Sequence, residues 1–372
     1  MDLHERYDLR QVVNAYDKAT NLGSAAVHPA IAEVVTASLH HPFELAAMQD
    51  VAGRMIARAL GSEYGGVTAC AAAGITLGVA AAMTGKDTTR IAQLPDTTGM
   101  SSRVILQKGH AINFGAPVVQ MIRLSGATVV EVGDTNSASV SMLRWELDRG
   151  DVAAIVAVES YHTAGYAGIR PAELADIAHE YDIPLIVDAA TQELRAPEVV
   201  ATGADFVVCS AHKYFQATTA GIMAGRRTLV EAALLQNQGI GRGMKPGKEA
   251  IFGVIAAMEL YMERDLEEWS AGEQRKLDII MARLSDLHGL ALSLSPDPNG
   301  CPFNRIEANI DAQTTGYTAE TVQKALAEGN PTVQVRVYRG DRQRFFINAT
   351  EMSDADIEVL CARILEMFSQ QH

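Results

Sequence analysis

The chain has 372 residues, 48% of them hydrophobic and 20% charged, and it carries a formal net charge of −14. This length and composition predict one large or two moderate domains with a sizeable core. Such acidity argues against nucleic acids and anionic membranes as partners. The longest apolar stretch, at about residues 70–83, is too short to span a bilayer comfortably.

The pattern of cysteines and histidines predicts no metal site. The four cysteines are scattered without metal-ligand spacing, and the ten histidines form no ligand motif. We therefore expect buried thiols in a reducing compartment and no metal ion. Since the charged N-terminus lacks the apolar region of a signal peptide, we expect a cytoplasmic protein.

Residues 1–45 are predicted to form an arm that also contributes to a smaller domain. Helices are expected at 29–39, after a proline start, and at 43–60, before Gly61. A short strand at 65–70 then leads through a turn of very small residues, Cys70–Gly74, into a helix that reaches Met83. Such a turn lets backbone N–H groups approach an anion at a helix N-terminus. Close packing of a helix on a sheet would explain the small residues equally well.

From residue 104 to residue 209, apolar strands alternate with helices. The strands are expected at 104–107, 128–132, 152–158, 185–188 and 205–209, with helices at 117–124, 145–149, 171–181 and 199–202. This order predicts an α/β fold with a mostly parallel sheet that helices cover on both faces. His110, Asp188 and Lys213 follow three of the strands, at the carboxyl edge where function collects in such sheets.

The character of the sequence changes after two long helices, predicted at 249–261 and 265–287. Strands at 291–294 and 303–310 and helices at 318–328 and 354–368 predict a compact α+β domain. The segments 333–338 and 344–347 alternate like a hairpin. We therefore place a large domain at 46–268 and a small C-terminal domain at 269–372.

Lys213 indicates a specific catalytic chemistry only when it is considered together with other residues. Taken alone, a lysine just after a strand is better interpreted as facing solvent. Asp188 lies 25 positions earlier, at the end of the neighbouring predicted strand. A lysine can form a Schiff base with a ring aldehyde, and a buried carboxylate can keep a ring nitrogen protonated. With His110 stacked on the ring and a phosphate held at the Cys70–Gly74 turn, these are the requirements of pyridoxal phosphate.

The chain resembles the selenocysteine-synthase-like (L-seryl-tRNA selenium transferase-related) family of pyridoxal-phosphate enzymes, which have the aspartate-aminotransferase fold (fold type I). The likeness is to its shorter members without a tRNA-binding region, of the D-glucosaminate-6-phosphate ammonia-lyase type, and it covers nearly the whole chain. The most diagnostic stretch is 239–249, Gly-Ile-Gly-Arg to Lys-Glu, before an apolar helix. The other matching stretches are 13–15, 20–23, 67–74, 94–96, 107–110, 184–190, 203–205, and Ser210 with Lys213.

The resemblance implies roles for the matching residues. Lys213 would hold the cofactor and move protons at the substrate α-carbon, Asp188 would bind the pyridine nitrogen, and His110 would stack on the ring. Arg336 would bind the substrate carboxylate, although a solvated strand arginine is an equally good interpretation. The remaining implied contacts are Cys70, Ala71, Ala72 and Ser210 at the cofactor phosphate, and Arg242 and Lys245 near the cofactor or a substrate anion, across a dimer interface.

The loops expected to face the substrate depart from the family pattern. Ala211–His212 stands where relatives carry two glycines, and Ala217–Thr219 where they carry a Gly-Pro-Gln turn. Asp17–Lys18 replaces a glycine and a threonine, and Ala69–Cys70 replaces serine-glycine. The candidate substrate contacts or acid–base groups in these and nearby loops are His212, His162, Tyr161 and Lys18. Each of them could equally be an ordinary loop residue.

From these residues and the resemblance we expect a pyridoxal-phosphate enzyme that acts on an amino acid or amino-sugar acid through a carbanion at Cα. We favour β-elimination, as in ammonia-lyases and dehydratases, which yields a 2-keto acid. Racemisation, aldol cleavage and β-replacement follow the same logic and are alternatives. A non-catalytic protein that only binds pyridoxal phosphate is an alternative of another class. We expect a small amino-acid-like substrate, no nucleic-acid or membrane partner, and a homodimer or a higher even-numbered oligomer.

Overall fold

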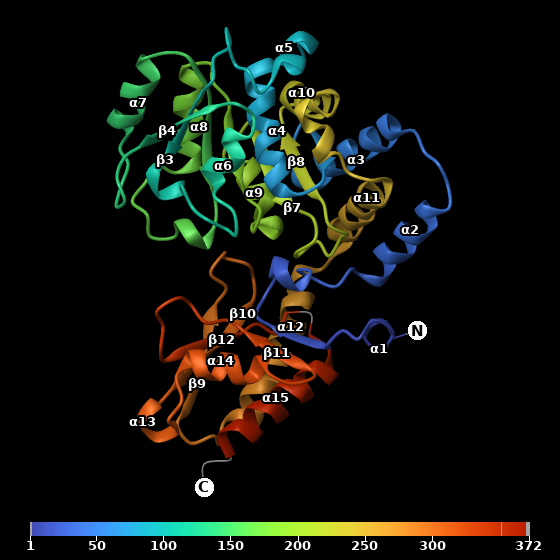
Figure 1. Ribbon diagram of the computed structural model, residues 1–372, viewed down its shortest axis with the longest axis vertical. Helices are drawn as coiled ribbons and strands as arrows, with labels where there is room; N and C mark the ends of the chain where they lie inside the picture. The colour runs from blue at the N-terminus through green and yellow to red at the C-terminus, as the bar shows by residue number, and fades with distance from the viewer. Residues whose placement is uncertain (1, 351, 370–372) are drawn as a thin grey trace. The chain divides into compact units, whose positions relative to one another are not determined.

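The computed structural model describes residues 2–350 and 352–369. Two compact units make up the chain, and each is described by itself. One unit contains residues 27–263, and the other combines the N-terminal segment up to residue 26 with residues from 264 onward. Figure 1 shows the elements of both units. We call them the large unit and the small unit.

A seven-stranded sheet forms the centre of the large unit in the described part of the chain. Its strand order is β2-β8-β7-β6-β5-β3-β4. All neighbouring strands pair in parallel, except that β8 is antiparallel to both β2 and β7. The strands are β2 (Tyr64–Thr68), β3 (Arg103–Gln107), β4 (Thr128–Val132), β5 (Val152–Val158), β6 (Leu185–Asp188), β7 (Phe206–Ser210) and β8 (Gly221–Gly225).

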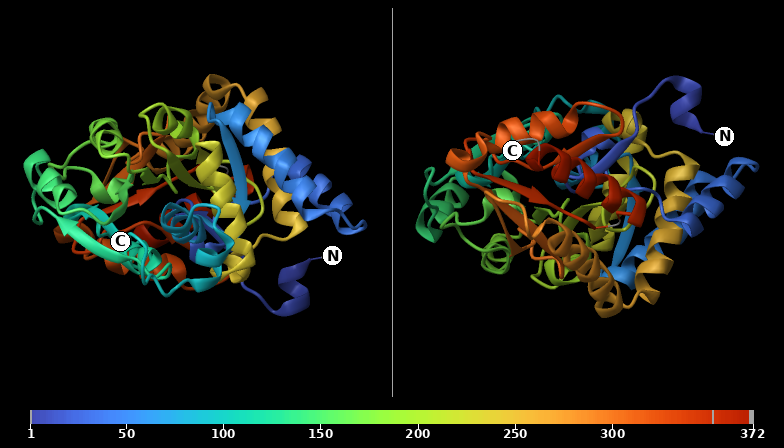
Figure 2. Two further views of the ribbon diagram at one scale, coloured as in Figure 1. Left: turned by 90° about the horizontal axis from the view of Figure 1, so that it is seen from above. Right: turned by 90° about the horizontal axis from the view of Figure 1, so that it is seen from below.

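Helices cover both faces of this sheet, which explains the nearly continuous apolar runs of the central strands. Successive residues of β7 enter opposite cores, with Val208 in one and Val207 in the other. The first core is built with α4 (Ala71–Thr84), α6 (Val118–Arg123) and α10 (Arg227–Leu235). The second is built with α2 (Pro29–Leu39), α3 (Leu45–Leu60), α7 (Val140–Asp148), α8 (Pro171–Glu180), α9 (Ala196–Val200) and α11 (Lys248–Glu263). In Figure 2, α2 and α3 run beside α11, in agreement with their contacts.

The small unit has its own core, in which distant parts of the sequence meet. Strands β9 (Leu290–Pro296), β10 (Asn304–Ile310) and β12 (Arg344–Ile347) form an antiparallel sheet, and β1 (Val12–Ala15) pairs in parallel with β11 (Thr332–Val335). The helices α12 (Leu266–Leu284), α14 (Ala319–Ala327) and α15 (Asp354–Ser369) supply the remaining core side chains. The short helices outside these layers are α1 (Leu3–Tyr7), α5 (Thr88–Gln93) and α13 (Ala312–Thr315).

The structure confirms the predicted α/β class and its mostly parallel sheet, but it corrects local predictions. The expected hairpin of 333–338 with 344–347 is wrong, because β11 pairs with β1 and only an isolated bridge joins Arg336 to Phe346. Strand β8 and helix α10 were not predicted, since β8 is a short run rich in glycine and alanine. Cys70 is partly exposed, whereas the other three cysteines are buried as expected. Within the residues described, no helix has the length and apolar character needed to cross a membrane.

Candidate active site

Asp188 and Lys213 are held by one short segment after strand β6. Asp188 is the last residue of β6 and pairs with Val208 of β7, and Lys213 follows β7 by three residues. The Lys213 Nζ donates a hydrogen bond to the carbonyl of Ala190 at 2.9 Å. The backbone N–H of the same Ala190 donates to Asp188 Oδ1 at 3.1 Å. The amine and the carboxylate therefore lie at neighbouring strand ends, as the sequence predicted.

The Asp188 carboxyl lies in a site that penalises an uncompensated negative charge. Asp188 is only 5% exposed. Burial raises the pKa of its carboxyl to about 6, although the N–H of Ala190 and the positive charge of Lys213 both act to lower this pKa. A buried carboxylate gains most from a further cation or charged hydrogen-bond donor beside it. The protonated nitrogen of a pyridine ring is such a partner.

His110 presents a neutral ring after β3, which β5 separates from β6 in the sheet. It ends the 3₁₀ turn Lys108–His110 that directly follows β3. Its Nδ1 accepts the backbone N–H of Val158 at 3.0 Å, and burial lowers its pKa to about 4. The ring is therefore uncharged at neutral pH, with its proton on Nε2. Tyr166 packs edge-on against it at 5.8 Å between ring centroids.

The N-terminus of α4 is left open for an anion. Cys70 is its N-cap in extended conformation, and its side chain caps none of the first N–H groups. Gly221 of β8 pairs with Ser210 and approaches so closely that a Cβ there would lie 2.4 Å from the Cys70 carbonyl. Gly74 packs on Val208 just as tightly. The small residues therefore allow close packing, as one interpretation expected, and no side chain caps the first N–H groups of α4, as the anion interpretation requires.

Arg242 and Lys245 lie in a segment that is tied to this turn. The backbone carbonyl of Met244 accepts hydrogen bonds from the N–H of Ala69 and the hydroxyl of Thr68, both at 3.0 Å. The two basic side chains are exposed. The segment thus carries two exposed cations within a few residues of Met244, whose carbonyl is hydrogen-bonded to the residues just before α4.

The structure places His212 and His162 in different surroundings. His212 is half-buried, and its Nδ1 donates to the carbonyl of Ala220 at 3.4 Å. Burial lowers its pKa. His162 is exposed on the 3₁₀ turn Tyr161–Thr163, where its ring lies 4.0 Å from that of Tyr161, centroid to centroid. His212 is therefore the more buried of the two candidates.

Arg336 belongs to the small unit, and its surroundings exclude the interpretation as a solvated arginine. It is 9% exposed. Its Nη2 lies 3.3 Å from Asp17 Oδ2, and its Nε donates to the Tyr16 carbonyl at 3.3 Å. The guanidinium also lies over the Tyr16 ring at 4.5 Å. Asp17, one of the residues that depart from the family pattern, is thus a direct partner of the predicted carboxylate-binding arginine.

One buried carboxylate near the site was missed by sequence reasoning. Glu193 follows Asp188 by five residues, on the 3₁₀ turn Glu193–Arg195, and is fully buried. Together with burial, its charge and that of Asp188 raise the pKa of the Cys209 thiol well above its ordinary value. Cys209 is therefore a neutral core residue. The only signal was a glutamate shortly after a strand-ending aspartate, which a loop explains as well.

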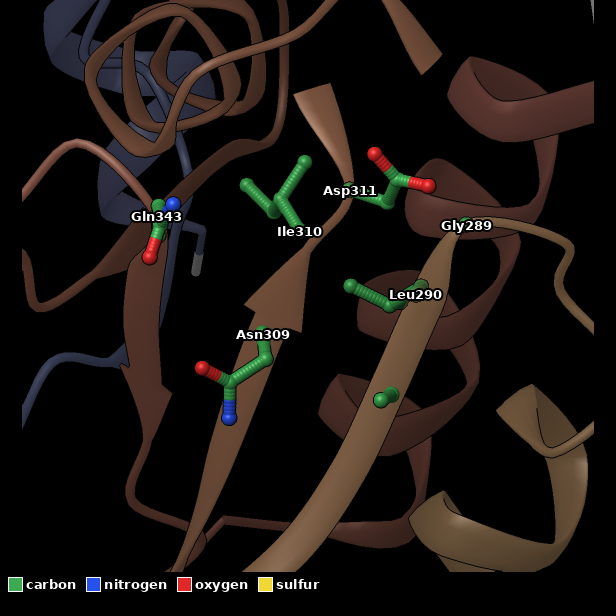
Figure 3. Close-up of a pocket in the computed structure, with 7 residues that line it drawn as sticks. Gly289, Leu290, Asn309, Ile310, Asp311 and Gln343 are labelled. Carbon is green, nitrogen blue, oxygen red and sulfur yellow. The ribbon is translucent and has the colours of Figure 1, made fainter. Parts of the chain in front are cut away.

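Other features of the described structure do not compete with this site. A pocket of about 380 Å³ in the small unit is drawn in Figure 3. Its one ionisable group, Asp311, caps α13 by accepting the N–H groups of Gln313 and Thr314. Its lining is Gly289, Leu290, Ala291, Asn309, Ile310, Asp311 and Gln343. In the part of the chain that is described, no three metal-binding side chains gather in one place.

Comparison with known proteins agrees with this arrangement. Residues 18–296 match the model of the L-seryl-tRNA selenium transferase family. The chain belongs to this family. It is 33% identical over 370 residues to D-glucosaminate-6-phosphate ammonia lyase from Salmonella typhimurium, with 98% of both chains covered. It is 31% identical to 5'-C-glycyluridine monooxygenase-decarboxylase from a Streptomyces species, with 96% of this chain and 89% of the relative covered.

Solved structures extend this likeness to three dimensions. A structure of D-glucosaminate-6-phosphate ammonia-lyase superposes with a TM-score of 0.90 at 32% identity and covers 100% of this chain and 99% of that one. An alanine–glyoxylate aminotransferase from Nostoc matches with a TM-score of 0.60 at 15% identity, over 96% and 95% of the chains. That second match shows the fold alone. The predicted family and the predicted fold of pyridoxal-phosphate enzymes are confirmed, and the named relative and its structure support the predicted class, a pyridoxal-phosphate-dependent lyase.

The described residues fit pyridoxal phosphate. Asp188 is a buried carboxylate that favours a cationic partner, and the close approach of Gly221 to α4 leaves an uncapped helix N-terminus for the phosphate. Lys213 supplies an amine beside them. The donor set therefore matches the charges of the cofactor at both ends.

Proposed function

We propose that this protein is a pyridoxal-phosphate-dependent lyase that expels a β-substituent from an amino acid or amino-sugar acid by β-elimination, after which hydrolysis releases the amino nitrogen as ammonia and yields a 2-keto acid. The observation that carries the proposal is the joint anchoring of Lys213 and Asp188 by the backbone of one residue, since Ala190 accepts from the Lys213 amine through its carbonyl and donates to Asp188 through its N–H. This geometry keeps an amine and a buried carboxylate in register at neighbouring strand ends. Family membership and the ammonia-lyase relative support the reaction.

When bound, pyridoxal phosphate supplies an electron sink that stabilises negative charge at the substrate α-carbon. Lys213 would hold the cofactor and then take and return the proton at that carbon. Asp188 would bind the ring nitrogen, and its negative charge would keep that nitrogen protonated. His110 would stack as a neutral ring, which its low pKa and its hydrogen bond from Val158 both favour.

The ends of the cofactor and substrate would be held by groups of matching charge. The uncapped N–H groups of Ala71 and Ala72, the N-cap Cys70 and the buried Ser210 would bind the cofactor phosphate. Arg242 and Lys245 would lie near the cofactor or a substrate anion, in a homodimer or a higher even-numbered oligomer. Arg336 would bind the substrate carboxylate and would exchange Asp17 for it, with His212 and His162 as further candidates for substrate contact.

The relatives and the changed loops define the alternatives that an experiment has to separate. Racemisation, aldol cleavage and β-replacement start from the same carbanion. A relative named as a monooxygenase-decarboxylase shows that related chains are not limited to elimination. A protein that binds the cofactor without catalysis is the alternative of another class. We also propose a small-molecule substrate and a cytoplasmic location, supported by the acidic composition, and the domain boundaries at residues 45/46 and 268/269 stay a prediction.

The first experiment tests cofactor attachment. Purified protein with added pyridoxal phosphate should show a visible absorption band, and borohydride reduction should fix the cofactor's mass on the peptide that contains Lys213. Lys213→Ala should lose both signals. Lys248→Ala is the matched control, because Lys248 donates to the carbonyls of Leu39 and His41 and serves a structural role. Absence of the band in the wild-type protein would refute the proposal.

The second experiment identifies the reaction. D- and L-amino acids and amino-sugar acids, including D-glucosaminate 6-phosphate, are screened for ammonia and 2-keto acid release, with and without oxygen. Release that needs no oxygen supports the lyase. Exchange of the α-proton without ammonia indicates racemisation, oxygen-dependent release of CO₂ indicates a decarboxylating oxygenase, and no response across the panel indicates a silent binder.

A further inference from the structure

The outer face of the small unit's three-stranded sheet carries an arginine that the proposed function does not use. Along β10, Ile306, Ala308 and Ile310 enter the core, so Arg305 lies on the opposite face by strand alternation. Phe346 of β12 also stays out of that core. The Arg305 guanidinium lies 4.1 Å from the centroid of the Phe346 ring. Phe346 is only 4% exposed, so this face carries a covered aromatic ring with a half-buried cation on it.

Arg305 is fixed in place while most of its donors stay unused. Its Nη1 donates to the Tyr338 hydroxyl at 2.6 Å, and its Nε is buried without a hydrogen-bond partner. A guanidinium has five N–H donors, and within the described residues the bond to Tyr338 is the one hydrogen bond of the Arg305 side chain. A half-buried cation with an orphaned donor is costly unless something compensates it. A bound anion would supply this compensation.

Neighbouring arginines, by contrast, have carboxylate partners. Arg336 is paired with Asp17, and Arg344 is paired with Asp341 at 2.8 Å. For Arg305, no ion pair is found among residues 2–350 and 352–369. The charge of Arg305 acts to lower the pKa of Asp297, but Asp297 Oδ1 accepts the N–H groups of Asn299 and Cys301. The charge of Arg305 is therefore not neutralised by a direct partner.

Arg305 and Arg336 both lie close to the ring of Tyr338. The Cζ atoms of the two guanidinium groups are 5.5 Å and 5.7 Å from the Tyr338 ring centroid, so they cannot be farther apart than twice the larger distance. A small molecule with two anionic groups can span this separation. Both arginines are stacked on aromatic rings, which limits their motion before a ligand arrives.

We propose that Arg305, oriented by Tyr338 and Phe346, is the binding site for a second anionic group of the substrate, a phosphate or a carboxylate, distinct from the α-carboxylate assigned to Arg336. The substrate class is then an amino acid with an anionic group at its far end. This inference rests on the proposed function for its catalytic meaning. The anion site itself rests on the geometry of the small unit alone.

Calorimetry with the cofactor-loaded full chain tests the site without any turnover. Inorganic phosphate and succinate serve as probes, so that the two sources of anionic charge are distinguished. Arg305→Gln should weaken binding of the better probe by about 10- to 100-fold, the value of a charge-assisted contact. Arg305→Lys keeps the charge but loses the planar fork, and it should show an intermediate loss. Arg344→Gln, on the same sheet with its own carboxylate partner, should bind like the wild type.

Kinetics then connects the site to the reaction. For a substrate pair that differs only in the second anionic group, Arg305→Gln should lower kcat/KM by about 10- to 100-fold for the doubly anionic member and leave the other unchanged. Arg336→Gln should lower both. Equal probe binding by the wild type and Arg305→Gln, or no binding of either probe to the wild type, would overturn the anion site. Since calorimetry needs no turnover, such a failure is distinguishable from a failure of the proposed lyase activity.

Discussion

Replacing the buried carboxyl of Asp188 should stabilise the cofactor-free protein while destroying its use of the cofactor. Burial raises the pKa of Asp188 to about 6 from an ordinary 3.8. The folded state therefore holds the Asp188 proton more tightly than the unfolded state does. Its contribution to stability is complete below pH 3.8 and is lost as the pH rises through 6. At pH 8 the ionised side chain costs the folded state about 3 kcal/mol relative to its protonated form.

Asp188→Asn removes that cost without changing the shape of the side chain. The Oδ1 of the asparagine still accepts the N–H of Ala190. Burial of the side-chain amide costs about 1 kcal/mol, which reduces the gain in stability. We expect the variant to unfold at a higher urea concentration at pH 8, with a net gain of about 2 kcal/mol. Between pH 8 and pH 5, the difference in unfolding free energy between Asp188→Asn and the wild type should narrow by about 1.4 kcal/mol. Asp134→Asn is the control, because two backbone N–H groups lower the pKa of Asp134, and its replacement should bring no gain at pH 8.

Added pyridoxal phosphate should reverse the order of stability of the wild type and Asp188→Asn. Since a protonated ring nitrogen would compensate the carboxylate, the cofactor should raise the unfolding midpoint of the wild type more than that of Asp188→Asn. Urea unfolding followed by tryptophan fluorescence, at pH 5 and pH 8 and with and without the cofactor, gives all four comparisons. A variant no more stable than the wild type at pH 8, or a difference that does not change with pH, would refute the account of Asp188 as a carboxylate ionised at a cost.

Three further predictions follow from the same contacts. Gly221→Ala should lower stability by about 1–3 kcal/mol, because the new Cβ would overlap the N-cap carbonyl of α4. The same overlap should weaken cofactor binding in a fluorescence titration. Gly243→Ala, with open space around it, should change neither stability nor cofactor binding. His110→Phe keeps a flat ring but leaves the buried N–H of Val158 unpaired, so it should cost about 1–3 kcal/mol in urea unfolding; an unchanged midpoint would contradict that hydrogen bond. Asp205→Asn weakens the ion pair between the buried Asp205 and the half-exposed Arg226 at the opposite end of the sheet, so it should cost about 1–2 kcal/mol and leave the affinity for the cofactor unchanged. A weaker affinity would show that the two ends are coupled.

The central part of the candidate site could be predicted because its residues sit where local patterns change. An apolar strand that ends in a polar residue marks the carboxyl edge of a parallel sheet, and this was sufficient to bring Asp188, His110 and Lys213 to one edge. The small residues after β2 likewise predicted an open helix N-terminus. Hydrophobic periodicity reports which side chains are buried along one element, so it specifies strand ends well.

The partners that come from distant parts of the chain could not be predicted in this way. β8 is only five residues long and begins and ends with glycine, and nothing local shows that it inserts antiparallel and brings Gly221 against the turn before α4. Likewise, no local pattern links Asp17 to Arg336, or leaves Arg305 with a single tyrosine hydroxyl as its partner.

The sequence alone thus determined the α/β class, the mostly parallel character of the central sheet and the lysine–aspartate pair, because each depends on patterns within a few residues. Only the tertiary structure decided which charges are matched and which are left for a ligand. That decision depends on strand register and on the face that each side chain occupies, for example the pairing of β1 with β11 across more than 300 residues. Such pairings are selected by packing of the whole unit and leave no mark on the local sequence.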